Sequence, residues 1–409
     1  MTANIRNFRG ISLCFLLFPF YFSAFTAETQ TIDWPRWRGP DGNGITSESD
    51  WDPGALENGP KVLWQAALGV GFSSASVAGE LVYAMGNAGG KDTIYCLNFE
   101  TGDVVWSYSY SCRAGSYPGP RATPTIDEGI VYTLSQEGHL FALDAETGEV
   151  RWQKHLPRDL GIRSPGWGFA GSPVVVGNTL LLNAGRSGLA LNKRNGSTLW
   201  DSGSGPGGYA APLIYIFERK TYAAIFGIKT IYGVEIDRGN VAWSYPWATR
   251  ADVNAADPLV HDGMVFVSSA YNKGSAVVDF SERSPEVVWR SDIFESHFSS
   301  FVLIDGYIYG NDGDARRASS GVFRCVDFRT GEEMWSAKLG FGSIIAAGDK
   351  LVMLNAFGGV FVAKIDPRNY VELASASLPR NQYWTPPILV RKRLLIRNLK
   401  GELFCIDVS

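Results

Sequence analysis

The feature that most constrains the fold is a short string that recurs along the chain at a nearly constant spacing. "FALDAETGEVRW" ends at Trp152, and similar strings close on other tryptophans. The six copies end at Trp106, Trp152, Trp200, Trp243, Trp289 and Trp335. Neighbouring copies lie 43 to 48 residues apart. Self-similarity at such a period is typical of propellers and solenoids, in which each unit packs on its neighbours.

The two ends of the series favour a closed ring over an open solenoid. A seventh copy keeps Asp366 but has Leu373 where the tryptophan is expected, and an eighth stops just after Asp407. Trp64 lies on an apparent strand with no hairpin before it. If residues 61–66 pair with residues 402–408, the eighth unit is complete and the ring closes. Closure of this kind leaves only short, protected sheet edges.

Each unit reads as four short strands. In residues 121–155 these are "ATPTID", "IVYTLSQ", "HLFALDA" and "VRWQKH", which are rich in β-branched and aromatic residues and separated by glycine-containing turns. No helical periodicity extends beyond two turns. The sequence therefore predicts an all-β protein, an eight-bladed β-propeller of four-stranded antiparallel blades.

The repeated residues have structural explanations. The Asp144 side chain is expected to bond the backbone of its own turn. Gly148 is expected to supply the positive φ of a turn followed by a bulge. Trp152 then stands on the outer strand and fills the wedge between neighbouring blades. These residues predict the fold and not the chemistry.

The first residues predict export. Arg6 and Arg9 precede the apolar run "ISLCFLLFPFYFSAF", and small residues follow near Ala24–Ala27. This order is typical of a signal peptide, although an uncleaved anchor is the alternative. We expect a signal peptide at 1–27, a leader segment at 28–60 and the propeller at 61–409. A bacterial protein of this kind would be periplasmic or associated with the cell envelope, without stable membrane insertion after cleavage.

Charge and cysteine content narrow the partners. The formal charge of −4 provides no basic footprint for nucleic acid. Cys96, Cys325 and Cys405 occupy the same repeat position, so they should be too far apart to form disulfides. Together with Cys112 they are expected to be buried apolar fillers. Only four histidines occur, none in close pairs along the chain, so no metal centre is expected. We expect a monomer.

The pattern Leu-Asp-x-x-Thr-Gly-x-x-x-Trp resembles the pyrroloquinoline-quinone-type (PQQ-like) propeller repeat, over roughly residues 60–409. The leader "DWPRWRGPDGNG" resembles the segment that precedes such propellers in exported bacterial proteins. The resemblance implies two functional classes. One is the quinoprotein dehydrogenases, which hold the quinone and calcium in the central funnel. The other is cofactor-free scaffolds of similar architecture, such as BamB.

The resemblance to the dehydrogenases is incomplete. Alcohol-oxidising members carry two adjacent cysteines, and this chain has no Cys-Cys pair. Those enzymes are generally much longer, and their calcium ligands have no assignable counterpart here. "GNDGDAR" (310–316) has the wrong spacing for an EF-hand loop. No cofactor is therefore expected, with PQQ and calcium as the alternative.

The candidate site lies on the face opposite the repeated hairpins, where the connections between blades are uneven. These connections carry aromatic, arginine and amide side chains suited to a ligand or a partner chain. The candidates are Tyr117, Arg121, Arg163, Trp167, Trp247, Arg250, Asn254, His297, Tyr383 and Trp384. No catalytic residue can be assigned.

The sequence thus predicts an exported, non-catalytic propeller. It would act as a binding or scaffolding module that holds a protein segment or a small-molecule ligand at its funnel face. The main alternative is a short PQQ- and calcium-dependent quinoprotein dehydrogenase, and a carbohydrate-active propeller is a remote third. Motifs of zinc proteases, α/β-hydrolases, P-loop and Rossmann proteins do not occur.

Overall fold

In the computed structural model, residues 1–2, 33–113, 117–282 and 284–409 are described. The chain divides into two compact units, Met1–Thr31 and Ile32–Ser409, and the account below concerns the second. The expected signal peptide and the start of the leader lie outside the described residues, apart from residues 1–2. Within the described residues, no helix combines the length and apolar character that a membrane crossing requires.

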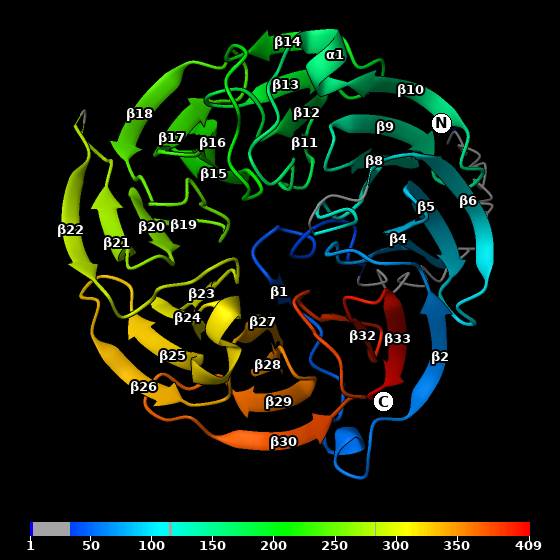
Figure 1. The fold of residues 1–409 in the computed structure, drawn as a ribbon, viewed down its shortest axis with the longest axis vertical. Helices are drawn as coiled ribbons and strands as arrows, with labels where there is room; N and C mark the ends of the chain where they lie inside the picture. The colour runs from blue at the N-terminus through cyan, green and yellow to red at the C-terminus, as the bar shows by residue number, and fades with distance from the viewer. Residues whose placement is uncertain (3–32, 114–116, 283) are drawn as a thin grey trace. The chain divides into compact units, whose positions relative to one another are not determined.

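The second unit is a ring of eight antiparallel sheets (Figure 1), which confirms the predicted eight-bladed β-propeller. Blade 1 consists of β3 (Ser76–Ala78), β4 (Leu81–Ala88), β5 (Lys91–Asn98) and β6 (Val104–Ser111). Blade 2 consists of β7 (Thr125–Asp127), β8 (Ile130–Leu134), β9 (His139–Asp144) and β10 (Val150–His155). Blade 3 consists of β11 (Val174–Val176), β12 (Thr179–Leu182), β13 (Leu189–Asn192) and β14 (Thr198–Asp201). Blade 4 consists of β15 (Leu213–Phe217), β16 (Lys220–Phe226), β17 (Thr230–Glu235) and β18 (Val241–Pro246).

The second half of the ring repeats the arrangement. Blade 5 consists of β19 (Leu259–His261), β20 (Met264–Ser269), β21 (Gly274–Asp279) and β22 (Glu286–Ser291). Blade 6 consists of β23 (Val302–Ile304), β24 (Tyr307–Asp312), β25 (Val322–Asp327) and β26 (Glu333–Ala337). Blade 7 consists of β27 (Gly342–Ala347), β28 (Lys350–Asn355), β29 (Gly359–Lys364) and β30 (Glu372–Ser377). Blade 8 consists of β31 (Ile388–Val390), β32 (Arg393–Arg397), β33 (Glu402–Asp407) and, as its outer strand, β2 (Val62–Ala67). The remaining elements are β1 (Ile45–Thr46), α1 (Leu156–Leu160), η1 (Pro53–Leu56) and η2 (Ala315–Ser320).

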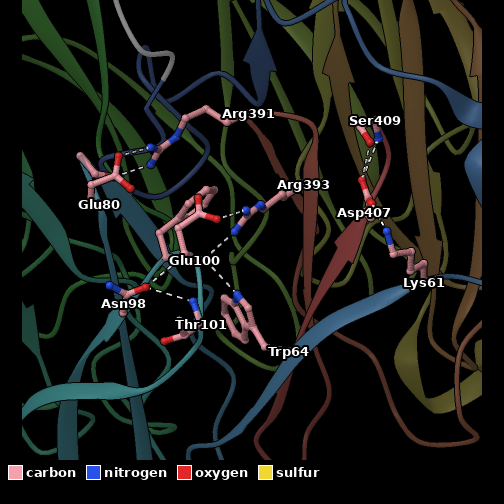
Figure 2. Close-up of polar contacts among 12 residues, drawn as sticks. Lys61, Trp64, Glu80, Asn98, Glu100, Thr101, Arg391, Arg393, Asp407 and Ser409 are labelled. Atoms are coloured by element: carbon pink, nitrogen blue, oxygen red, sulfur yellow. Dashed lines mark hydrogen bonds and ion pairs between the residues drawn. The ribbon is translucent and has the colours of Figure 1, made fainter.

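The ring closes as the sequence predicts. Strand β2 pairs antiparallel with β33, so that Trp64 faces Cys405. Figure 2 shows the junction between blades 8 and 1, where the Trp64 indole donates to the carbonyl oxygen of Phe99 at 2.9 Å. Arg393 donates to the same carbonyl at 2.8 Å. Lys61 and Asp407 form an ion pair at 2.8 Å within blade 8.

The repeated tryptophans join each blade to the next. The indole of Trp106 donates to Ala145 in the next hairpin, and that of Trp152 donates to Lys193, both at 2.9 Å. The same bond to a backbone carbonyl is made by Trp64, Trp200, Trp289 and Trp335. Trp243 is the exception, because its indole donates to the Tyr215 hydroxyl at 2.8 Å. It also stacks on Phe280, with ring centroids 4.5 Å apart.

The hairpin itself has the predicted geometry. Asp144 Oδ1 accepts from the backbone N–H groups of Glu146 and Thr147, at 3.1 and 2.9 Å. Gly148 has φ of 74°, and a Cβ there would lie 2.6 Å from the Trp106 ring. The strand register shifts between Val150 and Trp152, as a bulge requires. Glycine is therefore needed both for its backbone conformation and for the close approach of a neighbouring indole.

Hydrophobic cores lie between neighbouring blades. Middle strands such as β4 and β20 are buried on both faces, whereas outer strands such as β6 alternate between exposed and half-buried positions. This pattern explains why the middle strands read as continuous apolar runs in the sequence. Cys96, Cys112, Cys325 and Cys405 are buried free thiols, which confirms that these four form no disulfide.

Candidate functional site

The leader segment from Asp33 to Asp50 passes through the centre of the ring, where Figure 1 shows it in dark blue around β1. Trp34 exchanges two backbone hydrogen bonds with Val77 on the inner strand of blade 1. The carbonyl of Pro35 accepts from Ile126 in blade 2 at 2.8 Å. Further on, β1 pairs parallel with β27 of blade 7. The leader therefore bonds to inner strands around much of the ring.

The leader enters and leaves on the face that carries the repeated hairpins. The Asp33 carboxylate accepts from Gly79 in the β3–β4 turn at 3.0 Å. Beyond β1, Glu48 accepts from the backbone of Arg391 in the β31–β32 turn at 2.6 Å. Turns between first and second strands lie on the same face as the hairpins between third and fourth strands. The leader thus occupies the centre from the hairpin side and leaves the opposite side, the funnel face, open.

Asp257 anchors the leader to the wall of the funnel. Its carboxylate accepts from the Trp37 indole at 2.6 Å, from the Ala211 backbone at 2.8 Å and from the Ser300 hydroxyl at 3.0 Å. Arg38 forms an ion pair with the same carboxylate at 3.7 Å. One carboxylate therefore joins the leader to blades 4, 5 and 6.

A belt of short side chains surrounds the neck of the funnel, two residues before each inner strand. The backbone N–H of Ser74 donates to the Thr123 hydroxyl, and that of Thr123 donates to the Ser172 hydroxyl, at 3.0 and 2.9 Å. Asp257 extends the pattern by donating its N–H to the Ser300 hydroxyl at 3.1 Å. These bonds link equivalent positions of successive blades and fix the shape of the neck.

A pocket lies above the leader on the funnel face and holds about 420 Å³ of space, part of it open to solvent. Trp34, Trp37 and Arg38 of the leader line it together with serine hydroxyls and with Phe298 and Trp384. A second cleft lies between the leader and blades 3 to 5 and spans about 370 Å³ with its open solvent; Arg36, Asp41 and Asp257 form part of its lining. Both cavities exist because the leader fills only part of the centre.

Arg38 is the buried cation of the pocket. Its side chain is 4% exposed, and it donates to the carbonyl oxygens of Asn43, at 2.7 Å, and Phe301. Its Nη1 has no hydrogen-bond partner in the described part of the chain. Burial lowers the pKa of Arg38, and the Asp257 carboxylate opposes that shift. This Nη1 is the atom that lies 3.7 Å from the Asp257 carboxylate, which partly compensates the buried charge.

Seven ring side chains form a continuous series around the mouth of the funnel, which we call the aromatic arc. Successive ring centroids are 4.8 to 6.4 Å apart. In order, the arc consists of Trp167, Tyr117, Phe72, Trp384, Phe298, His297 and Tyr271. Tyr117 and Trp167 are 47% and 46% exposed. Large exposed rings held in a row are unusual on a monomer surface and typical of binding sites.

Several of the predicted site residues come together here. Tyr117, Trp167, His297 and Trp384 belong to the aromatic arc. Arg121 lies over the Phe72 ring, 5.4 Å from its centroid, and donates to the Tyr117 carbonyl at 3.0 Å. Burial lowers the pKa of Arg121. Arg163 is exposed in the same connection as Trp167 and donates to the Ser204 carbonyl at 3.3 Å. Arg250 is exposed on the connection before β19.

Three of the predicted residues are buried. The Trp247 indole donates to the Ser269 hydroxyl at 3.1 Å, and the Asn254 amide donates to the Trp247 carbonyl at 3.1 Å. The Tyr383 hydroxyl donates to the Pro379 carbonyl at 2.7 Å. All three are at most 1% exposed. In this structure they hold the connecting loops in place and offer no surface to a ligand.

His297 lies between an acid and a phenol. Its Nε2 is 2.9 Å from the Tyr271 hydroxyl, and its Nδ1 is 3.4 Å from the Asp314 carboxylate. Arg316 stands over the Tyr271 ring at 4.8 Å and also pairs with Asp314. Burial lowers the pKa of His297, so the imidazole is neutral near pH 7. The cluster stiffens one end of the aromatic arc.

Sequence reasoning missed Phe72, Phe298, Tyr271 and Arg38. A positional signal does exist for the first two, because each lies four residues before an inner strand. Arg121, Tyr209 and Trp384 occupy the same position in other blades. An alignment of the repeats on their inner strands would therefore have pointed to Phe72 and Phe298 as well as to Trp384. Arg38 has no such signal, since the leader is not part of the repeat.

Comparison with known proteins agrees with this architecture. The family model described as "Outer membrane protein assembly factor BamB" matches residues 54–200 and 113–337. A protein of that name from Shewanella oneidensis is 24% identical over 323 residues, which cover 75% of this chain and 79% of the relative.

Two solved structures share the fold. BamB from Moraxella catarrhalis has a TM-score of 0.59 at 16% identity and covers 84% of this chain and 97% of its own. A europium-containing methanol dehydrogenase has a TM-score of 0.67 at 13% identity. The match covers 92% of this chain and 98% of the dehydrogenase chain. At such identities the solved structures support the fold alone. The family model spans more than half of the sequence, and the chain therefore belongs to the PQQ-like propeller family described as outer membrane protein assembly factor BamB.

Proposed function

We propose that this chain is a non-catalytic scaffold of the bacterial cell envelope that binds an extended segment of a partner protein across its funnel face. The observation that carries the proposal is the aromatic arc, a row of partly exposed rings above a pocket floored by the leader. Aromatic side chains and arginines supply most of the binding energy in protein interfaces. A wide, shallow row of rings suits a peptide better than a compact metabolite.

The charges of the mouth suggest the chemistry of the segment. Arg121 donates to the Tyr117 carbonyl, Arg163 is exposed in the same connection as Trp167, and Arg38 lines the pocket. Arginine pairs well with carboxylates because its donors match their geometry. A segment that alternates apolar or aromatic side chains with Asp or Glu would use both the rings and the guanidinium groups. The chain is proposed to bind it as a monomer.

The relatives support the envelope location. Those named outer membrane protein assembly factors match most of this chain. The predicted signal peptide agrees with the same location. An assembly factor needs to hold client or partner segments without chemistry, which is consistent with the absence of an assignable catalytic residue.

The quinoprotein alternative requires residues that hold calcium and a quinone. The residues lining the funnel pocket supply serine hydroxyls and one guanidinium but no carboxylate. Calcium takes about six to eight oxygen ligands and favours carboxylates among them. The pocket lining therefore does not fit a calcium-held quinone. A thermal-shift titration with PQQ and calcium chloride should leave the melting temperature unchanged, and a clear rise would contradict the scaffold proposal.

The direct test is site-specific photocrosslinking in the natural host. A photoreactive phenylalanine analogue at Tyr117 probes the aromatic arc, and the matched control is the same analogue at Leu199, which is 49% exposed on the outer strand β14. We expect one defined envelope protein crosslinked from position 117 and not from position 199. Identical patterns from both positions, or none from position 117, would contradict the proposal.

A further inference from the structure

A second cluster of reactive side chains lies outside the aromatic arc, where blade 1 meets blade 2. Cys112 directly follows β6, Glu137 lies in the β8–β9 turn, and His139 begins β9. The thiol sulfur, a carboxylate oxygen and an imidazole nitrogen of these three residues all lie within 4.8 Å of one another. Among the residues that the structure describes, no other group of three such side chains converges in this way.

A second histidine stands beside the cluster. His155 on β10 pairs in register with His139 on β9, and their ring centroids are 4.5 Å apart. The expectation of no metal centre considered only histidines that are close along the chain, whereas His139 and His155 are close in space. Antiparallel pairing places two histidines side by side although a whole hairpin separates them in the sequence.

The surroundings orient the ligands. The Ser135 hydroxyl lies 3.2 Å from His139 Nδ1, which leaves Nε2 as the free nitrogen. A hydrogen bond to the other ring nitrogen is the usual way in which proteins orient a metal-binding histidine. A neutral imidazole is the form that coordinates a metal.

Cys112 is 1% exposed, and its backbone is fixed by a hydrogen bond. Its carbonyl accepts from the Asn87 amide at 3.2 Å, and the same amide donates to Asp92 at 2.7 Å. Burial first, and the Asp92 carboxylate second, raise the pKa of the Cys112 thiol. The metal-free thiol is therefore protonated, and a metal ion would have to displace that proton.

We propose that Cys112, Glu137 and His139 bind a zinc-class divalent cation, with water at the fourth position. A mixed set of sulfur, nitrogen and oxygen ligands selects Zn²⁺ and its spectroscopic substitute Co²⁺ over Ca²⁺ or Mg²⁺. On binding, the Cys112 thiol loses its proton to solvent and becomes a thiolate ligand. The ion ties the end of β6 to the β8–β9 turn and so fixes the start of the connection that carries Tyr117.

The test uses the full-length purified protein stripped of metals with a chelator and then dialysed against Zn²⁺ or Co²⁺. We expect about one ion per chain by elemental analysis, and with Co²⁺ the thiolate-to-metal absorption of a sulfur ligand. Cys112→Ser and His139→Gln should each weaken binding by roughly tenfold or more. The matched controls are Cys325→Ser, another buried free thiol, and His261→Gln, and both should bind as the parent does.

Glu137→Gln provides the variant least able to disturb folding, because the side chain is half-exposed in a turn. It should also weaken binding while the circular dichroism spectrum stays unchanged. The proposal is overturned if the parent binds no Zn²⁺ at micromolar concentration. It is also overturned if Cys325→Ser weakens binding as much as Cys112→Ser, or if folded Glu137→Gln and His139→Gln bind Zn²⁺ as tightly as the parent.

Discussion

The indole nitrogen of Trp37 donates a hydrogen bond to the carboxylate of Asp257 at 2.6 Å, across 220 residues of sequence. Because the other carboxylate oxygen accepts from Ala211, this contact joins the leader to the neck of the funnel. The leader is thus a structural part of the ring and supplies the floor of the pocket. The stability of the propeller and the shape of its binding face depend on the same segment.

Replacing Trp37 by Phe removes the indole donor and keeps the ring. Asp257 then loses one of its partners in a buried place, so we expect the free energy of unfolding to fall by about 1–3 kcal/mol. Trp51→Phe is the matched control, because Trp51 is also buried but its indole nitrogen has no partner among the described residues. That change should cost only the buried volume it removes, and therefore less than Trp37→Phe. Urea unfolding of both variants measures the difference, and equal losses would contradict the assigned role of Trp37.

The tryptophan that joins blades 6 and 7 should contribute strongly to stability. Trp335 is 8% exposed and donates to the Asp366 carbonyl at 2.8 Å. Trp335→Ala should cost about 3–5 kcal/mol, since it removes a buried ring and leaves a cavity. Leu373 occupies the equivalent position in blade 7 but is 40% exposed, so Leu373→Ala should cost less than about 1 kcal/mol. Similar losses of unfolding free energy for Trp335→Ala and Leu373→Ala in urea would argue against the role of Trp335 in packing blade 6 on blade 7.

Two glycines with the same backbone conformation separate steric contact from backbone strain. Gly148 and Gly129 both have φ of 74°. A Cβ at position 148 would lie 2.6 Å from the Trp106 ring, whereas one at position 129 would meet no atom within 4 Å. Gly129→Ala should cost roughly 1 kcal/mol for its positive φ alone. Gly148→Ala should cost clearly more in thermal or urea unfolding, and an equal cost would show that the indole does not press on the hairpin.

The hairpin carboxylate predicts a pH dependence of stability. Hydrogen bonds from Arg151 and from the Thr147 backbone lower the pKa of Asp144 from 3.8 to about 2. A pKa that is lower in the folded than in the unfolded chain stabilises the fold above pH 4, and this contribution is lost as the pH falls toward 2. Asp144→Asn should reduce that loss, and it should fold because Asn98 and Asn192 already occupy the same repeat position. Urea midpoints at pH 5 and 2.5 test this, and an unchanged pH slope in the variant would refute it.

The ring could be predicted from the sequence because every blade carries the same local instructions. Asp144, Gly148 and Trp152 act within one hairpin and on its immediate neighbour, so their spacing is visible in the chain. The closure by β2 and β33 followed from the same register. The path of the leader could not be predicted in this way, since Trp37 and Asp257 share no pattern that relates them.

The candidate site was only partly predictable. The face was inferred from topology, but burial of individual loop residues depends on tertiary packing. Trp247 and Asn254 bond to each other and to Ser269, which no local pattern in the sequence indicates. The convergence of Cys112, Glu137 and His139 could not be predicted because the three residues come from two different blades and meet only in the folded ring.

The most direct test of the proposed function is the affinity of the crosslinked partner segment, made as a peptide, for the purified propeller. Isothermal titration calorimetry would compare the parent with Trp167→Ala and Trp384→Ala in the aromatic arc and with Glu332→Ala in a hairpin on the opposite face. The account predicts at least roughly tenfold weaker binding for each arc variant, as expected of an anchor residue, and no change for Glu332→Ala. Binding that survives both arc variants intact, or that falls with Glu332→Ala, would contradict it.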